Sequence, residues 1–203
     1  MSDVAEFEAC IRAGGVGLFP ADTLYGLACE ASNEAAIERI HALKGRDDGK
    51  PSAVMFFAPL ELREVLSMSG PRTREAIGSL LPGPVTLVVA NPRGLYPHAC
   101  REQRERLGIR LIDGPLAGSG VAVFQTSANL SGAPPQQRLE DVDPGIRSGV
   151  DLEIDGGAVG GEPSTVVDLT RLEEGEWEIL REGALSRPAL ERALRAAGTP
   201  AGT

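Results

Sequence analysis

The sequence predicts an α/β protein with a single mixed, twisted sheet, and three observations lead to this class. Short apolar runs bounded by Gly, Pro or small polar residues recur along the chain, as buried strands do. Segments with apolar residues at helical spacing come mostly early and are interleaved with these runs. The 203 residues suffice for one substantial core, and no Pro- or Gly-rich linker divides them into two.

Helical spacing of apolar residues predicts the helices. The first ends at Gly14-Gly15, and Ser32 or Asn33 can cap the second. The fourth ends before the Pro82-Gly83-Pro84 segment, because proline does not continue a helix. The fifth is weak, and the last is expected to be short and exposed. In order, the helices are expected over 4–13, 33–43, 59–68, 71–80, 139–147 and 187–197.

Continuous apolar runs predict the strands. The first ends in Pro20, and a loop with a further extended piece follows over 22–27. The run that ends at Gln125 leads into a polar turn, and the last two runs form an expected pair joined by an acidic turn. A Gly-rich loop covers 156–163, and 198–203 are expected to fray. In order, the strands are expected over 16–20, 53–57, 85–90, 107–111, 121–125, 152–155, 164–169 and 177–181.

Composition narrows the functional classes. No apolar run approaches the roughly 20 residues that span a bilayer, and the acidic N-terminus does not resemble a secretory signal. Three cysteines without CxxC spacing are typical of a reducing cytoplasm rather than of a disulfide framework or a zinc site. A net charge of −9 disfavours non-specific binding of nucleic acid, although a local basic groove is compatible with it. We therefore expect a cytoplasmic globular protein.

Both lysines of the chain, Lys44 and Lys50, lie in one short stretch with Arg46, and every other basic residue is an arginine. A lysine ammonium is a compact charge that suits phosphate oxygens, whereas arginine presents a planar fork. The stretch therefore predicts a polyphosphate site. It is equally compatible with a solvated basic turn at a helix end, where cations complement the helix dipole.

The sequence contains no GxxxxGK[ST], GxGxxG, GxSxG or HExxH pattern, so the common nucleotide and hydrolase motifs are absent. Small polar residues remain at the ends of expected strands. Asp22 to Tyr25, Thr126 to Asn129, and Ser164-Thr165 could each bind a small polar ligand or an anion. Turn formation also explains each group, because Asp, Asn, Ser and Thr side chains bond to nearby backbone.

Arg110 and Arg181 each lie at the end of an apolar strand. A guanidinium in such a place needs a partner, which can be a ligand carboxylate, a phosphate or an acidic residue of the protein. Cys29 fits a small core residue better than a nucleophile. We assign no metal ligand.

Taken in order, six segments resemble those of the YrdC-like threonylcarbamoyl-adenylate synthase family. They are Phe19 to Leu27, Lys44 to Arg46 with Lys50-Pro51, Pro82 to Thr86, Ser127 to Gly132, Ser164 to Asp168, and Arg181 to Gly183. Each is a weak signal alone, but the ordered set over about 10–185 is specific. The resemblance is to the short bacterial form, with a catalytic domain over 1–186 and a helical tail over 187–203. It implies a single open twisted sheet flanked by helices, with a concave, positively charged face.

The resemblance implies a nucleotidyltransferase that converts L-threonine, bicarbonate and ATP to L-threonylcarbamoyl-adenylate and pyrophosphate. Partner proteins of the family then transfer the threonylcarbamoyl group to tRNA; direct tRNA binding would be weak, and no membrane contact is implied. By matching position, the ATP contacts would be Lys44, Arg46, Lys50, Asn129 and Arg181. The threonine contacts would be Thr23, Arg110, Ser127 and Ser164. Mg²⁺ is expected on the phosphates.

Four positions depart from the family pattern and cluster toward the amino-acid end. They are Ala21, Ser52, Met55 and the Leu111-Ile112-Asp113 run. The departures motivate an alternative, a paralogue that uses a different amine or a carbamoyl group. A further alternative is an RNA-binding module that uses the concave basic face, which the net charge of −9 disfavours.

Overall fold

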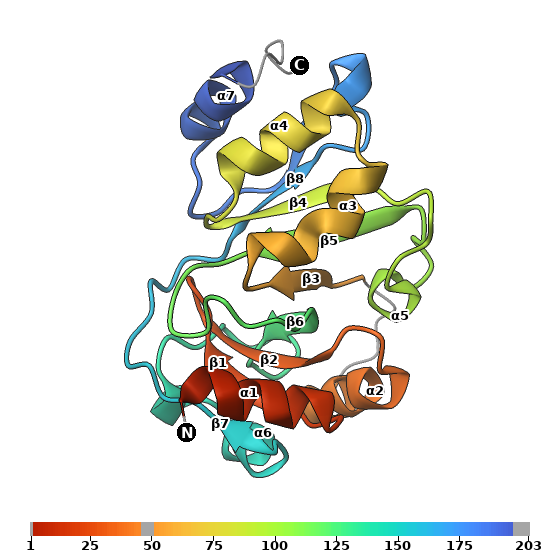
Figure 1. Ribbon diagram of the computed structural model, residues 1–203. Helices are drawn as coiled ribbons and strands as arrows, with labels where there is room; N and C mark the ends of the chain where they lie inside the picture. The colour runs from red at the N-terminus through yellow and green to blue at the C-terminus, as the bar shows by residue number, and fades with distance from the viewer. Residues whose placement is uncertain (1, 46–50, 197–203) are drawn as a thin grey trace.

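The computed structural model describes residues 2–45 and 51–196, and these form one nine-stranded sheet with helices on its faces (Figure 1). The strand order is β7-β1-β2-β6-β3-β5-β4-β8-β9. Three neighbouring pairs are parallel, β1 with β7, β3 with β5 and β4 with β8, and the others are antiparallel. The open, mixed α/β sheet expected from the sequence is confirmed. Within the described residues, no helix combines the length and apolarity that crossing a membrane requires.

The expected elements occur in the expected order along the chain, with one helix in addition, and the helix expected over 139–147 is divided into a 3-10 turn and a short α-helix. The strands are β1 Gly17–Pro20, β2 Tyr25–Glu30, β3 Ala53–Phe56, β4 Val85–Ala90, β5 Arg106–Leu111, β6 Val123–Ser127, β7 Leu152–Glu153, β8 Thr165–Asp168 and β9 Glu178–Arg181. The α-helices are α1 Asp3–Arg12, α2 Glu34–Leu43, α3 Arg63–Met68, α4 Pro71–Leu80, α5 Pro97–Cys100, α6 Pro144–Ser148 and α7 Arg187–Ala196. Short 3-10 helices cover Pro59–Leu62, Leu139–Asp141 and Leu172–Glu174.

Alternation along the strands gives the sheet two different faces. Leu107, Ile109 and Leu111 of β5 are buried in the main apolar core, which also contains residues of α2, α3, α4 and α7. The intervening residues, Arg106, Gly108 and Arg110, line a cavity on the opposite face. We call these the covered face and the cavity face.

The cavity face is only partly covered. Phe7 and Ile11 of α1 pack with Phe19 and Phe57 in a second, smaller apolar cluster near β1. Beyond this cluster, the same face is open above β4, β5 and β8, where the cavity lies. Because one helix covers only part of the face, a ligand can reach the central strands.

Four points of the sequence interpretation need correction. Strand β6 runs two residues further than expected, because Thr126 and Ser127 pair with β2 instead of beginning a turn. The helix expected over 59–68 is a 3-10 turn followed by α3, and α5 was not expected at all. The last helix is not simply exposed, since Leu190 and Leu194 of α7 are buried in the main core. Residues 197–203 lie outside the described residues.

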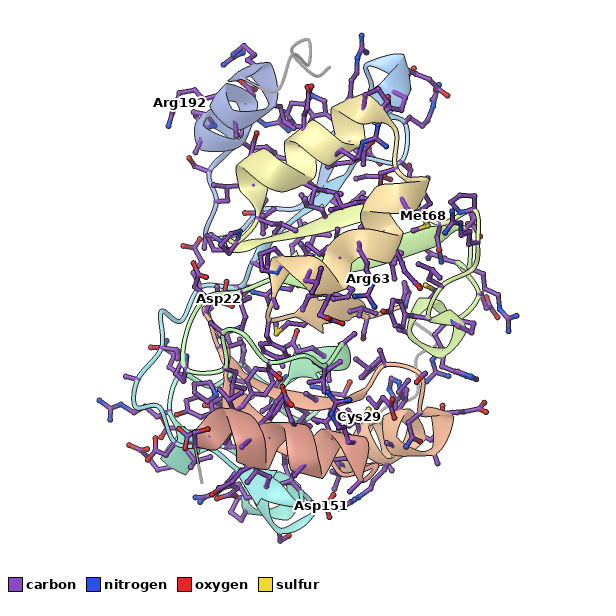
Figure 2. All side chains as sticks on the ribbon, viewed as in Figure 1. Asp22, Cys29, Arg63, Met68, Asp151 and Arg192 are labelled. Carbon is purple, nitrogen blue, oxygen red and sulfur yellow. The ribbon has the colours of Figure 1, made fainter. Side chains whose placement is uncertain are left out.

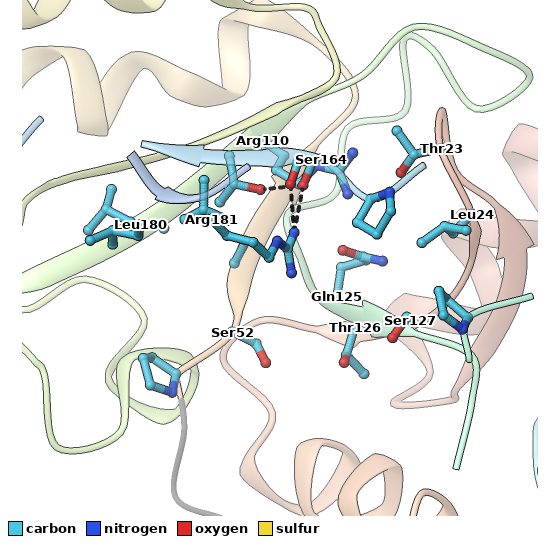
Figure 3. Close-up of a pocket in the computed structure, with 18 of the residues that line it drawn as sticks. Thr23, Leu24, Ser52, Arg110, Gln125, Thr126, Ser127, Ser164, Leu180 and Arg181 are labelled. Carbon is cyan, nitrogen blue, oxygen red and sulfur yellow. Dashed lines mark hydrogen bonds between the residues drawn. The ribbon is translucent and has the colours of Figure 1, made fainter. Parts of the chain in front are cut away.

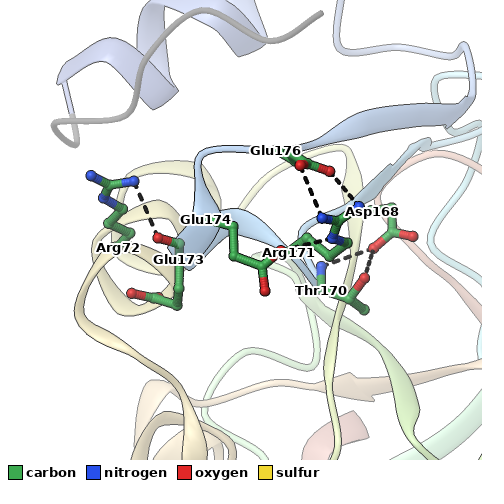
Figure 4. A network of polar contacts seen from close by, with 7 residues as sticks. All are labelled: Arg72, Asp168, Thr170, Arg171, Glu173, Glu174 and Glu176. Atoms are coloured by element: carbon green, nitrogen blue, oxygen red, sulfur yellow. Dashed lines mark hydrogen bonds and ion pairs between the residues drawn. The ribbon is translucent and has the colours of Figure 1, made fainter.

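The strand pair joined by an acidic turn is confirmed as β8 and β9. Side chains of the turn itself hold its shape (Figure 4): Arg171 contacts Glu174 at 2.8 Å and Glu176 at 2.5 Å. Glu173 accepts hydrogen bonds from the backbone N–H and the hydroxyl of Thr73 on α4, both at 2.9 Å. These contacts anchor the hairpin to α4 and fix where β9, and with it Arg181, lies at the cavity.

Candidate functional site

The cavity has a volume of about 580 Å³ and is lined by residues from widely separated parts of the chain (Figure 3). Thr23 comes from the β1–β2 turn, Arg110 from β5 and Arg181 from β9. Six of the nine residues predicted to bind ATP or threonine line this one cavity. They are Thr23, Arg110, Ser127, Asn129, Ser164 and Arg181.

The three basic residues of the predicted polyphosphate stretch are not among the described residues that line the cavity. Arg46 and Lys50 lie outside the described residues. Lys44 is described and is not among the residues that line the cavity. The structure therefore brings together the predicted amino-acid contacts and two of the predicted nucleotide contacts.

Lys44 follows the last residue of α2, and its side chain is only 3% exposed. Its ammonium donates hydrogen bonds to the backbone oxygens of Ser127 and Asn129, the latter at 2.8 Å. Its own backbone oxygen accepts a hydrogen bond from the N–H of Ser131 at 3.0 Å. Lys44 thus holds the turn after β6 in place, and this turn carries two predicted ligand contacts.

Arg110 is buried and forms an ion pair with Asp22, the residue beside Thr23. Each partner keeps one buried polar atom without a hydrogen-bond partner among the described residues, Nε of Arg110 and Oδ2 of Asp22. Of the partners that the sequence left open for Arg110, the structure shows a protein carboxylate. A ligand carboxylate can still share this guanidinium, because arginine has five N–H donors.

Arg181 has no carboxylate partner among the described residues. Its Nη2 donates to the backbone oxygen of Ser164 at 2.7 Å and to the Ser164 hydroxyl at 3.3 Å (Figure 3). Burial, and then the positive charge of Arg110, hold the pKa of Arg181 below its ordinary value. Two guanidiniums that repel each other across one cavity favour an anion between them.

Ser164 is fixed by a second contact, since its hydroxyl lies 2.9 Å from the hydroxyl of Thr86 on β4. Asn129 is fixed by its own turn, and its amino group donates to the backbone oxygens of Leu130 and Ala133, both at 2.8 Å. The amide oxygen of Asn129 is buried without a partner among the described residues. Asn129 can therefore only accept from a ligand, which suits a hydroxyl or amino group and not a phosphate oxygen.

Among the described residues, the cavity is lined by less unpaired positive charge than the expected basic face implies. Arg106 also lines the cavity, but it is paired with Asp168. Asp168 is in turn held by the backbone N–H and hydroxyl of Thr170 (Figure 4). Arg106 and Arg110 are thus neutralised by carboxylates, and Arg181 supplies the excess charge among the described lining residues.

Two residues singled out in the sequence do not belong to the cavity. The Tyr25 hydroxyl donates to Gly157 O at 2.9 Å and accepts from the Gly156 N–H at 3.0 Å, so it holds the Gly-rich loop rather than a ligand. Cys29 is fully buried in the main core (Figure 2), and burial raises the pKa of its thiol to about 12. The expectation that Cys29 is a core residue is confirmed.

Sequence reasoning missed some cavity residues, notably Gln125, Arg106 and Gln103. Gln125 and Arg106 share a strand and a face with predicted contacts, Gln125 with Ser127 and Arg106 with Arg110. Alternation along each strand was the signal that could have found them.

Two of the departures from the family pattern, Ala21 and Met55, lie in the smaller apolar cluster with Phe19 and Ile112, and neither lines the cavity. Ser52 does line it. No group of three His, Cys, Asp or Glu side chains among the described residues could hold a metal ion.

Comparisons with known proteins point to one family. The family model for Sua5, YciO and YrdC, described as telomere recombination, matches residues 9–183. The chain is 36% identical over 187 residues to threonylcarbamoyl-AMP synthase of Mus musculus, covering 85% of this chain and 64% of that protein. Its fold is similar to P. abyssi Sua5 complexed with L-threonine, with a TM-score of 0.82 and 29% identity over 94% of this chain and 56% of that one. It is also similar to E. coli YciO, with a TM-score of 0.76 and 26% identity over 89% of each chain. The chain thus spans less than two thirds of the mouse and P. abyssi proteins.

Proposed function

This chain belongs to the Sua5/YciO/YrdC family, and we propose that it is an ATP-dependent nucleotidyltransferase that makes L-threonylcarbamoyl-adenylate. Its substrates are L-threonine, bicarbonate and ATP, and pyrophosphate is the second product. The observation that carries the proposal is the convergence of six predicted contacts, from five separate segments, on one cavity. Relatives that bear the name threonylcarbamoyl-AMP synthase give further support.

The cavity is divided between the two organic substrates. Thr23, Arg110 and Ser127 receive threonine, with Arg110 toward its carboxylate. Arg181 and Asn129 receive the nucleotide, with Asn129 accepting from a hydroxyl or amino group. Ser164 lies between them, since it is bonded to Arg181 and is also a predicted threonine contact. Arg46 and Lys50 hold the phosphates, whereas Lys44 positions the turn that carries Ser127 and Asn129.

The reaction follows from this placement. The threonine amine adds to the carbon of CO₂ released from bicarbonate and loses a proton, which gives a carbamate. A carbamate oxygen then attacks the α-phosphorus of ATP, and the bond from that phosphorus to the β-phosphate oxygen breaks. The second step brings two anions together, the carbamate and the triphosphate, so orientation and positive charge are what the protein must supply. The uncompensated guanidinium of Arg181 meets that need.

A magnesium ion would be carried by the triphosphate and by water, because the described residues offer no cluster of ligands for it. When bound, it would neutralise phosphate charge. The product, a mixed anhydride, would pass to proteins that transfer the threonylcarbamoyl group to tRNA.

The decisive experiment measures pyrophosphate release from ATP and bicarbonate with each amino acid in turn. A response confined to threonine is the expected result. Release with another amine at an equal or higher rate would contradict the threonine assignment and favour the paralogue. Ala21 and Met55 were the reason for that alternative, and their place in the apolar cluster weakens it.

The predicted phosphate contacts give a second test. Arg46→Ala and Lys50→Ala are each expected to lower kcat/KM for ATP by at least tenfold, the usual effect of losing a charged hydrogen bond. Their thermal unfolding should match that of the wild type. A variant that unfolds earlier but keeps its activity would contradict the phosphate role.

A further inference from the structure

Gln125 occupies a place in the cavity that the proposed mechanism does not use. It lies on β6, two residues before Ser127, and its side chain points into the middle of the cavity (Figure 3). Only 9% of the residue is exposed. Its polar atoms are not among the buried atoms without a partner, so the carboxamide faces the space of the cavity and is available to a ligand.

The carboxamide of Gln125 has no hydrogen-bond partner among the described residues. The other amide of the site differs, because Asn129 bonds to two backbone oxygens of its own turn. Gln125 therefore presents both a donor and an acceptor to whatever fills the cavity. A neutral amide is poorly suited to carboxylates and phosphates when guanidiniums are at hand, but it matches a hydroxyl, which also donates and accepts.

The contact with Gly26 shows where in the cavity the Gln125 amide lies. A methyl group at Gly26 would lie 2.6 Å from Nε2 of Gln125, so the amide lies directly over this glycine. Gly26 follows Thr23 and Leu24 closely in the chain, and both line the cavity. The amide therefore lies beside the segment that supplies Thr23, and Figure 3 shows it between Thr23 and Leu24 on one side and Arg181 on the other.

We propose that Gln125 is a specificity-determining residue that recognises the side-chain hydroxyl of the amino-acid substrate. The inference rests on the proposed function, since it assigns a role within the threonine site. It explains both an amide that faces the cavity without a protein partner and the absence of a side chain at Gly26. A site built to bond a hydroxyl discriminates against an isostere that lacks one, because the amide is then left unpaired.

The test compares threonine with valine, its isostere without the hydroxyl, in the pyrophosphate-release assay. The wild type should prefer threonine, and Gln125→Leu should reduce the ratio of kcat/KM values by about tenfold, the contribution of one such bond. Gly26→Ala should reduce the same ratio, because the new methyl displaces the amide while Gln125 itself is unchanged. Gln103→Leu makes the same chemical change elsewhere in the cavity and should leave the ratio unaltered.

Failure of the proposed function and failure of the Gln125 inference would give different results in this test. A wild type that releases no pyrophosphate with threonine would overturn the proposed function and this inference with it. If the wild type prefers threonine but Gln125→Leu lowers activity with threonine and valine equally, only the inference is overturned. A shift in preference between ATP and GTP at a constant threonine-to-valine ratio would also overturn it, and would place the amide at the base instead.

Discussion

The two faces of the sheet are built from the same strands but carry different properties. On β5, Leu107 and Ile109 face a core covered by helices, while Arg106, Gly108 and Arg110 alternate with them and face a cavity. Apolar burial on the covered face supplies stability. The cavity face instead holds buried charges and unsatisfied polar atoms, which cost stability and serve ligands. Substitution of a residue on the covered face should therefore lower stability more than activity, and substitution of its neighbour on the cavity face should lower activity more than stability.

The largest effect is expected on the covered face. Ile109 is fully buried, so Ile109→Ala leaves a void and should lower the free energy of unfolding by about 2–5 kcal/mol. Urea denaturation measures this loss. The kcat of the protein that remains folded should be close to that of the wild type. An Ile109→Ala variant that is stable but inactive would contradict the conclusion that the covered face supplies stability and the cavity face supplies activity.

On the cavity face, Arg181→Ala should lower activity much more than stability. Loss of a charged contact is expected to reduce kcat/KM for ATP by about 10- to 100-fold. The free energy of unfolding should change by less than about 1 kcal/mol, because Arg181 forms no ion pair with the described residues and Arg110 disfavours its charge. Arg195→Ala removes an exposed arginine of α7 that pairs with Glu191 and does not line the cavity, so it is the matched control and should keep full activity.

Lys44 connects the end of α2 with the turn after β6 that carries cavity residues, so its substitution should lower both stability and activity. Lys44→Met removes the donor to two backbone oxygens and should cost about 1–3 kcal/mol of stability. Activity should fall with it, as the turn with Ser127 and Asn129 loses its support. Lys44→Arg should not restore activity, because a planar fork does not replace a compact ammonium. Weak ATP binding at unchanged stability would instead indicate direct phosphate contact.

The smallest effect is expected where neither face is involved, at the pair of Asp151 with Arg39 on α2. Hydrogen bonds from Arg39 and from the Val16 N–H hold the pKa of Asp151 below its ordinary value. Its contribution is therefore present above the pKa of the unfolded chain and is lost as pH falls through the lower, folded pKa. The side chain is 42% exposed, so we expect less than about 1 kcal/mol. Stability measured between pH 5 and about pH 2 should decline less steeply in Asp151→Asn than in the wild type.

Much of the site could be predicted from strand ends. Thr23, Ser127, Ser164 and Arg181 each stand at or near the end of an apolar run, and these runs formed strands. The partners of these residues could not be predicted in the same way. The bond between Thr86 and Ser164 joins residues 78 positions apart, and the pair of Asp22 and Arg110 joins residues 88 apart.

Local pattern determined the elements of this protein and which residues share a face of each strand, because alternation and turn chemistry act over a few residues. Tertiary structure decided the strand order, and thereby which polar groups meet. It gave Arg110 a carboxylate, left Arg181 without one and turned Lys44 toward backbone oxygens. The reason is physical: pairing between distant strands is selected by burial of the whole sheet, and no short segment encodes it.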